Sequence, residues 1–265
     1  DTMVTVVDGN RFWDDYQSGE SLLDRKQGTD ESDTREIADL LIDQIEFANV
    51  LILNKTDLLD PFHVEEIDAI LKRFNPEAKI IHSSFGKISL ASVLNTNLFD
   101  FEKASHAAGW IKELNEEHVP ETEEYGISSF VYRRKKPFHP ERLMNWLENW
   151  PDEIVRAKGF FWLASRNNMS GLISQAGSSI MFQGAGEWVA TYSKEEQQQT
   201  FKEEPELLEK WDPVYGDRMT EIVFIGVNLE REKVEASLDT CLLTDSEMQK
   251  DWSLLLDPIP PFIVE

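Results

Sequence analysis

The sequence predicts an α/β domain with a parallel sheet, followed by a second domain of the α+β class. Up to Ile81, apolar β-branched runs alternate with amphipathic helical patterns. A strand, helix, strand, helix, strand order requires parallel strands that are buried on both faces. Beyond residue 125, short strand patterns separated by glycine-containing turns are typical of an antiparallel sheet. The 265 residues suffice for two domains, each with its own core.

The first domain is expected to contain three strands and two helices. The predicted strands are Met3–Val7, Val50–Leu53 and Ala78–Ile81. The predicted helices run between Ile37 and Ala48 and from His63 to Phe74. Asp33 and Glu36 have the spacing of a capping box before the first helix. Asp8 and Gly9 end the first strand in a turn.

An acidic segment with little apolar content separates the two domains. It contains Pro120 and predicts domain limits of 1–114 and 125–265, with 115–124 as the linker. In the second domain, the predicted strands are Ile127–Arg133, Val155–Ala164, Gly171–Ala176, Glu187–Tyr192 and Ile222–Val227. The predicted helices are Pro140–Trp150, Glu203–Trp211 and Glu232–Leu238.

Charge and composition argue against several classes of protein. The 26 basic and 50 acidic residues give a net charge of -24, which disfavours nucleic-acid binding because phosphates are held mainly by Lys and Arg. The one basic run, Arg133 to Lys136, is interpreted as a solvated strand end. There is no membrane-spanning run and no secretory signal pattern. A single cysteine, Cys241, fits a reducing compartment, so we expect a cytoplasmic protein.

The motif with the clearest chemistry is Asn54-Lys55-Thr56-Asp57, directly after a buried strand. Open α/β sheets bind ligands at the carboxyl ends of their strands. A carboxylate at Asp57 can accept hydrogen bonds from the ring N–H and the amino group of guanine, which adenine does not offer. Asn54 can donate to the acceptor edge of the base, and the Lys55 stem can cover its plane. The alternative is an exposed turn with a helix cap.

A second loop follows the next strand. Ser83, Ser84, Phe85 and Gly86 form a short polar turn that can present backbone N–H groups to the guanine oxygen. An ordinary strand-to-helix turn explains the same residues equally well. With Asn54, Lys55 and Asp57, these four complete the predicted nucleotide-binding set.

The stretch Gln44 to Leu58 resembles the signature of the CobW-family GTPases, and Asn75-Pro76 leading to Ser83–Gly86 is similar to the next family motif. The second domain resembles the CobW C-terminal domain at Arg156–Gly159, Trp188, Tyr215–Arg218 and Glu221–Gly226. Arg11–Trp13 and Tyr16–Arg25 are most similar to the zinc-responsive bacterial members.

The resemblance implies a fold and a set of ligands. Residues 1–114 would be the C-terminal part of a P-loop GTPase domain, and residues 125–265 a CobW-type α+β domain. The implied ligands are GTP with Mg²⁺ and a client metalloprotein, with zinc held by an upstream cysteine motif.

The sequence departs from the family at two motifs. The phosphate cradle Gly-x-x-x-x-Gly-Lys-Ser/Thr is absent, and Gly86-Lys87 does not qualify because Ile88 follows. The family's Cys-x-Cys-Cys zinc motif is also absent, and Cys241 does not replace it. We therefore expect a fragment that hydrolyses GTP poorly or not at all, with no catalytic residue and no metal ligand assigned. His118 and the nearby glutamates are interpreted as part of a solvated linker.

Two hypotheses of different classes remain. The favoured one is a piece of a GTP-binding and GTP-hydrolysing metallochaperone that delivers zinc to client metalloproteins when zinc is scarce. The other is a non-catalytic interaction module that docks a client protein, with a vestigial loop at Asn54. An unrelated regulatory GTPase is disfavoured by the similarity of the second domain. Selectivity for guanine over adenine discriminates between the first two.

Overall fold

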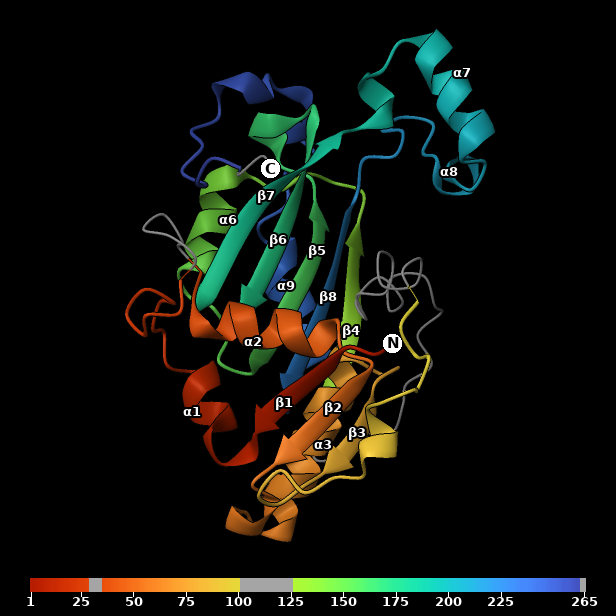
Figure 1. Cartoon of the computed structure of the whole chain (residues 1–265). Helices are drawn as coiled ribbons and strands as arrows, with labels where there is room; N and C mark the ends of the chain where they lie inside the picture. The colour runs from red at the N-terminus through yellow and green to blue at the C-terminus, as the bar shows by residue number, and fades with distance from the viewer. Residues whose placement is uncertain (29–34, 101–125, 263–265) are drawn as a thin grey trace. The chain divides into compact units, whose positions relative to one another are not determined.

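The computed structural model describes residues 1–28, 35–100 and 126–262 (Figure 1). The chain divides into two compact units. The first comprises Asp1–Phe130 with the short segments Gln175–Ile180 and Ile225–Leu229, and the second comprises the remainder. The predicted linker, 115–124, lies outside the described residues, as do Asp33 and His118.

A three-stranded parallel sheet forms the centre of the first unit, as predicted. Its order is β1 (Val4–Asp8), β2 (Val50–Asn54) and β3 (Lys79–His82). Val50, Leu51, Ile52 and Leu53 are all buried, because β2 has a strand on each side. The register pairs Asp8 with Asn54 and Leu53 with His82, so the three strands end at one edge.

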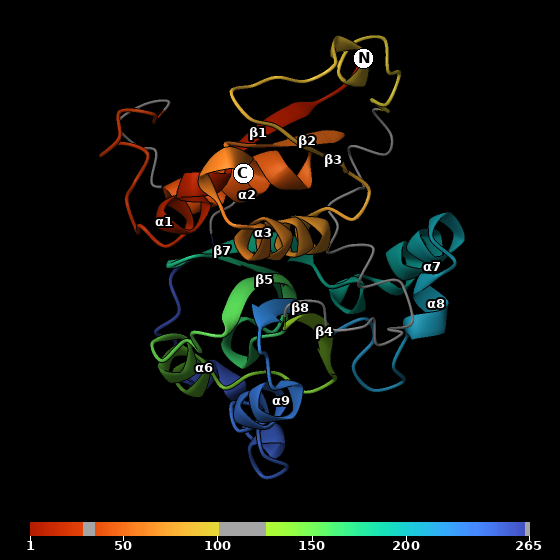
Figure 2. The ribbon, with the colours of Figure 1, turned by 90° about the horizontal axis from the view of Figure 1, so that it is seen from below.

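Two helices connect the strands. Both crossovers run in the same direction along the sheet, and right-handed connections then place both helices on the same face. Figure 2 shows α2 (Ile37–Glu46) and α3 (Pro61–Phe74) on that face. The short α1 (Phe12–Tyr16) follows β1. Val6 of β1 is 59% exposed, since no described element covers its side chain.

The helix starts differ slightly from the prediction. At α2, the Asp39 carboxylate accepts the Glu36 N–H at 3.0 Å, so the box lies one turn later than the Asp33 and Glu36 spacing indicates. Helix α3 begins at Pro61 rather than His63, because Asp60 caps it by accepting the His63 N–H at 3.0 Å. Proline suits this first position, where the N–H has no partner in the helix.

Asn75 ties the ends of both helices together. It is 5% exposed and follows the last residue of α3. Its side-chain amide donates to the carbonyls of Ile45 at 2.9 Å, Glu46 at 3.1 Å and Ala48 at 2.8 Å, at the end of α2. Its own oxygen accepts the Ala78 N–H at 3.1 Å, which positions the start of β3. One side chain thus satisfies carbonyls that a helix end leaves without partners.

The second sheet has the order β4-β8-β5-β6-β7, and the arrows of neighbouring strands in Figure 1 point in opposite directions. The predicted antiparallel sheet is therefore present. Its strands are β4 (Ile127–Arg134), β5 (Ile154–Phe161), β6 (Met169–Ala176), β7 (Ser179–Glu187) and β8 (Thr220–Val227). The helices are α6 (Pro140–Leu147), α7 (Lys194–Glu203), α8 (Leu207–Lys210) and α9 (Arg231–Asp239).

Two elements of the second domain were predicted wrongly. The strand expected at Glu187–Tyr192 is a 3-10 turn, and the preceding residues form β7 as the second arm of a hairpin with β6. The helix expected at Glu203–Trp211 is only the short α8. The longer α7 comes before it and ends at Glu203. Ser193 starts α7 by accepting the Glu196 N–H, and Pro205 prevents one continuous helix.

A paired carboxylate anchors the segment after α9. Arg142 of α6 donates to both oxygens of Glu247, at 2.9 and 2.8 Å. The Thr244 N–H donates to the same carboxylate at 2.8 Å. The Arg142 guanidinium and this N–H hold the pKa of Glu247 well below its usual range. The bidentate geometry fixes the segment more firmly than a single exposed ion pair would.

Replacing Asn75 with Ala removes the side-chain donor from three carbonyls at the end of α2 and frees the start of β3. We expect a loss of about 2 to 4 kcal/mol in the free energy of unfolding, measured by urea denaturation. Asn10, an exposed asparagine of the same unit, provides the matched control. Asn10→Ala should change stability by less than about 0.5 kcal/mol. Equal small effects of both substitutions would contradict the structural role of Asn75.

Glu247→Gln should destabilise the protein by about 1 kcal/mol at pH 7, because it removes the charged half of the pair with Arg142. A carboxylate whose folded pKa is lowered contributes stability above its unfolded pKa of about 4.3 and loses it as pH falls toward the folded value. The difference in the free energy of unfolding between wild type and variant should therefore shrink as the pH is lowered below about 5. Urea denaturation at several pH values measures this, and a difference independent of pH would contradict it.

Candidate functional site

The candidate site lies where the three parallel strands end, at the lower edge of the sheet in Figure 1. Asp8 ends β1, Asn54 ends β2, and the loop that begins at Ser83 follows β3. The first unit therefore brings the two predicted loops next to each other. This is the edge at which parallel α/β sheets bind their ligands.

Hydrogen bonds join the two loops. The Gly86 N–H donates to Asn54 Oδ1 at 3.0 Å, and the Thr56 N–H donates to the Ser83 carbonyl at 3.2 Å. The Thr56 hydroxyl donates to the same carbonyl at 3.1 Å and lies 3.3 Å from Ser84 Oγ. Ser83 is buried, and its N–H donates to the Leu53 carbonyl at 2.8 Å. The two loops are thus one cross-linked structure.

The Gly86 contact decides the orientation of the Asn54 amide. A backbone N–H requires an acceptor, so the side-chain oxygen faces Gly86. The NH₂ group then faces the other way and has no acceptor among the described residues, so it is available to a ligand. This is the orientation that donation to a base acceptor requires.

Lys55 has a left-handed backbone with φ 61° and pairs with Asp8, Nζ to Oδ2, at 2.6 Å. Its side chain is 44% exposed, so the pair is partly open to solvent. The second oxygen of Asp8 is buried and has no hydrogen-bond partner within the described residues. The pair holds the lysine on the β1 side of the Asn54 loop.

The Asp57 carboxylate is exposed and has no hydrogen-bond partner in the described part of the chain. In the second loop, the Gly86 N–H is already used by Asn54. The N–H groups of Ser84 and Phe85 donate to no described acceptor, so they are the donors that remain for a ligand oxygen. The edge thus offers the exposed Asp57 carboxylate, the Asn54 amide donor and the backbone donors of Ser84 and Phe85 to a ligand.

Sequence reasoning did not assign Thr56 or Gly9 to the site. Thr56 joins the loops through both its N–H and its hydroxyl, and a hydroxyl in the variable position of the motif is the only signal for this. A Cβ at Gly9 would lie 2.9 Å from Leu59 Cδ1 and 3.2 Å from the Asn54 carbonyl oxygen. The first turn after β1 therefore lies close against the Asn54 loop, and a side chain at Gly9 would require Leu59 to move.

The basic run in the second domain is neutralised by carboxylates. Each of its four cations forms an ion pair: Arg133 with Glu221, Arg134 with Asp239, Lys135 with Asp212 and Lys136 with Asp245. Cations already paired in this way are poor ligands for a phosphate backbone.

Metal ligands and membrane spans are not evident in the described ranges. No group of three His, Cys, Asp or Glu side chains there is arranged to hold a metal ion. Cys241 is buried, and burial raises the pKa of its thiol, which disfavours the thiolate form. No described helix is both long and apolar enough to cross a membrane.

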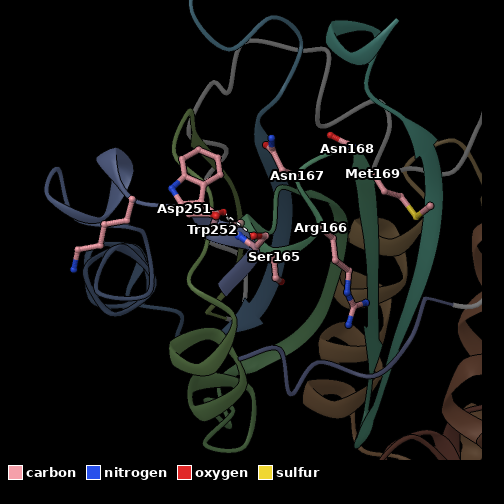
Figure 3. A pocket seen from close by; sticks show the side chains of 10 residues that line it. Ser165, Arg166, Asn167, Asn168, Met169, Asp251 and Trp252 are labelled. Carbon is pink, nitrogen blue, oxygen red and sulfur yellow. Dashed lines mark hydrogen bonds between the residues drawn. The ribbon is translucent and has the colours of Figure 1, made fainter. Parts of the chain in front are cut away.

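A pocket of about 440 Å³ opens in the second unit, between residues 164–169 and 250–253 (Figure 3). Its polar side chains are largely satisfied by the protein. Ser165 donates to Asp257 at 2.7 Å, Arg166 donates to the same carboxylate at 2.8 Å, and the Asn167 oxygen accepts from Trp162 at 3.0 Å. The arrangement points to no particular ligand chemistry.

Comparison with known proteins identifies the domains. The nucleotide-binding domain of the CobW/HypB/UreG proteins matches residues 1–82, and the cobalamin synthesis protein cobW C-terminal domain matches residues 127–242. Fold and matches together define a nucleotide-binding α/β domain followed by an α+β domain. The chain belongs to the CobW family.

Two proteins similar to this chain have names that refer to zinc. A zinc-regulated GTPase metalloprotein activator 1 from Dictyostelium discoideum is 43% identical over 98% of this chain and 56% of the relative. A zinc chaperone of Mycobacterium tuberculosis is 26% identical over 97% of this chain and 60% of that protein. The chain thus spans little more than half the length of these relatives.

Among solved structures, the chain is similar to a Zn(II)-bound YjiA GTPase from E. coli. The sequence identity is 18%, and the match covers 91% of this chain and 60% of that chain with a TM-score of 0.37.

The link between the loops can be tested without a ligand. Asn54→Ala removes the acceptor of the Gly86 N–H, so hydrogen exchange of that amide should accelerate by about tenfold or more. Asn54→Asp keeps an acceptor oxygen and should preserve most of the protection. Amide exchange followed by NMR measures both variants. Unchanged protection in Asn54→Ala would show that this hydrogen bond does not hold the loop.

Proposed function

We propose that the Asn54–Asp57 and Ser83–Gly86 loops read the guanine base of a nucleotide. The observation that supports this most directly is the exposed Asp57 carboxylate beside the Asn54 amide, because neither that carboxylate nor the Asn54 NH₂ group has a partner among the described residues. A carboxylate that accepts from the ring N–H and the amino group selects guanine over adenine. The free N–H groups of Ser84 and Phe85 suit the guanine carbonyl oxygen.

The proposed activity of the protein is GTP-dependent metallochaperone function, with Mg²⁺ accompanying the nucleotide. We assign base recognition, and not hydrolysis, to the residues of this chain, because its sequence holds no Gly-x-x-x-x-Gly-Lys-Ser/Thr phosphate cradle. Delivery of zinc to a client metalloprotein under zinc limitation is part of the same proposal. It is supported by two relatives named as a zinc-regulated activator and a zinc chaperone.

The location we propose is the cytoplasm, consistent with one cysteine in 265 residues. The net charge of -24 and the paired basic run argue that the partners are a nucleotide and a protein rather than nucleic acid. The domain limits, 1–114 and 125–265, remain our proposal for the chain.

Asp57→Asn tests base recognition directly. Charge-assisted hydrogen bonds contribute about 1.5 to 3 kcal/mol, so the affinity for GTP should fall about 10- to 100-fold. Preference should move toward XTP, because the asparagine amide donates to the xanthine carbonyl that replaces the amino group. Titration with GTP, ATP and XTP, followed by NMR shifts of the two loops, measures the three affinities.

Asp14→Asn is the matched control, since Asp14 is also exposed and the net charge changes equally. It should bind GTP as the wild type does. Equal binding of GTP and ATP by the wild type, or no shift in the two loops with any nucleotide, would contradict guanine recognition. The interaction-module hypothesis would then take its place.

A further inference from the structure

Phe85 is the most unusual residue at this edge. Its side chain is 81% exposed, and its backbone is left-handed with φ 56°. The following residue, Gly86, is also left-handed with φ 68°. A bulky residue seldom adopts this conformation, and exposing an aromatic ring to water forgoes the gain of burying it. Unfavourable local conformations of this kind tend to occur at ligand sites.

The residues on both sides of Phe85 are fixed to the Asn54 loop. Gly86 donates to Asn54 at 3.0 Å, and Ser84 Oγ lies 3.3 Å from the Thr56 hydroxyl. Phe85 is thus held close to the residues that would read the base, although its ring is free. The one described contact of the ring is with Lys87, whose Nζ lies 6.0 Å from the ring centroid.

The order of the sheet places Phe85 and Lys55 on opposite sides of the Asn54 loop. Lys55 is drawn toward β1 by its pair with Asp8, and Phe85 follows β3. Because β2 lies between these strands, a planar group held by Asp57 at the end of β2 would have Lys55 on one side. Phe85 would lie on its other side.

We propose that Phe85 is a base-stacking residue whose ring covers one face of the guanine that Asp57 reads at its edge. This rests on the proposed function. Every base has a π-face, so stacking adds affinity without selecting among bases. Selectivity stays with Asp57, whereas Phe85 and the Lys55 stem shield the two faces from water. In the nucleotide-bound protein, the base would then cover the ring that is exposed here.

Phe85→Asn removes the ring while retaining a residue that tolerates the left-handed conformation. Stacking predicts that its affinity for GTP falls about 5- to 100-fold, with the ratio of GTP to ATP affinity unchanged. Phe85→Tyr keeps a ring and should bind within about twofold of the wild type, below the loss expected on removing a stacked ring. Phe62→Ala, which removes another exposed phenylalanine of the same unit, is the control and should leave binding unchanged.

The same loss should appear in the Asp57→Asn background with XTP, because stacking is independent of the edge that is read. Guanine selectivity in the wild type together with full GTP affinity in Phe85→Asn would overturn the stacking role. A loss of selectivity in Phe85→Asn would also overturn it, since that result indicates a displaced loop. If the wild type binds GTP and ATP equally, the proposed function itself fails, so the two failures are distinguishable.

Discussion

The parallel pairing of β2 with both neighbours is the constraint on which the first domain depends. With a strand on each side of β2 and helices over one face of the sheet, all four apolar residues of Val50–Leu53 are buried. This register brings the ends of three strands to one edge. Every residue of the candidate site is attached to one of those ends. Asn75 supports the arrangement by fixing the end of α2 against the start of β3.

The site illustrates how few groups are left free at such an edge. Most polar atoms of the two loops are used to connect the loops to each other, as between Gly86 and Asn54. What remains unpartnered at this edge among the described residues includes the Asp57 carboxylate, the second oxygen of Asp8 and a small set of donors. Rigid placement of these groups limits the conformational entropy that binding would cost. The second domain, by contrast, pairs its basic run with carboxylates and holds its last segment through Arg142 and Glu247.

Prediction from sequence succeeded where a pattern is local and repeated. Helical spacing from Ile37 and the apolar run of β2 gave the α/β class and the parallel sheet. It failed for β7, whose glycines weaken the strand pattern and whose partner, β6, supplies the pairing. It also misplaced α7, because Ser193 and Glu196 form a capping box in a segment with little apolar periodicity. Glycines concealed the strand, and the polar sequence concealed the helix.

The sequence alone determined the family resemblance and the fold classes and proposed most of the candidate site residues, because short motifs carry residue identity and spacing. Only the tertiary structure decided how these residues meet. The orientation of the Asn54 amide, the position of Lys55 beside Asp8 and the exposure of Phe85 depend on contacts between residues far apart in the chain. Such contacts arise from strand order and register. These set the distance between segments and cannot be predicted from any single motif.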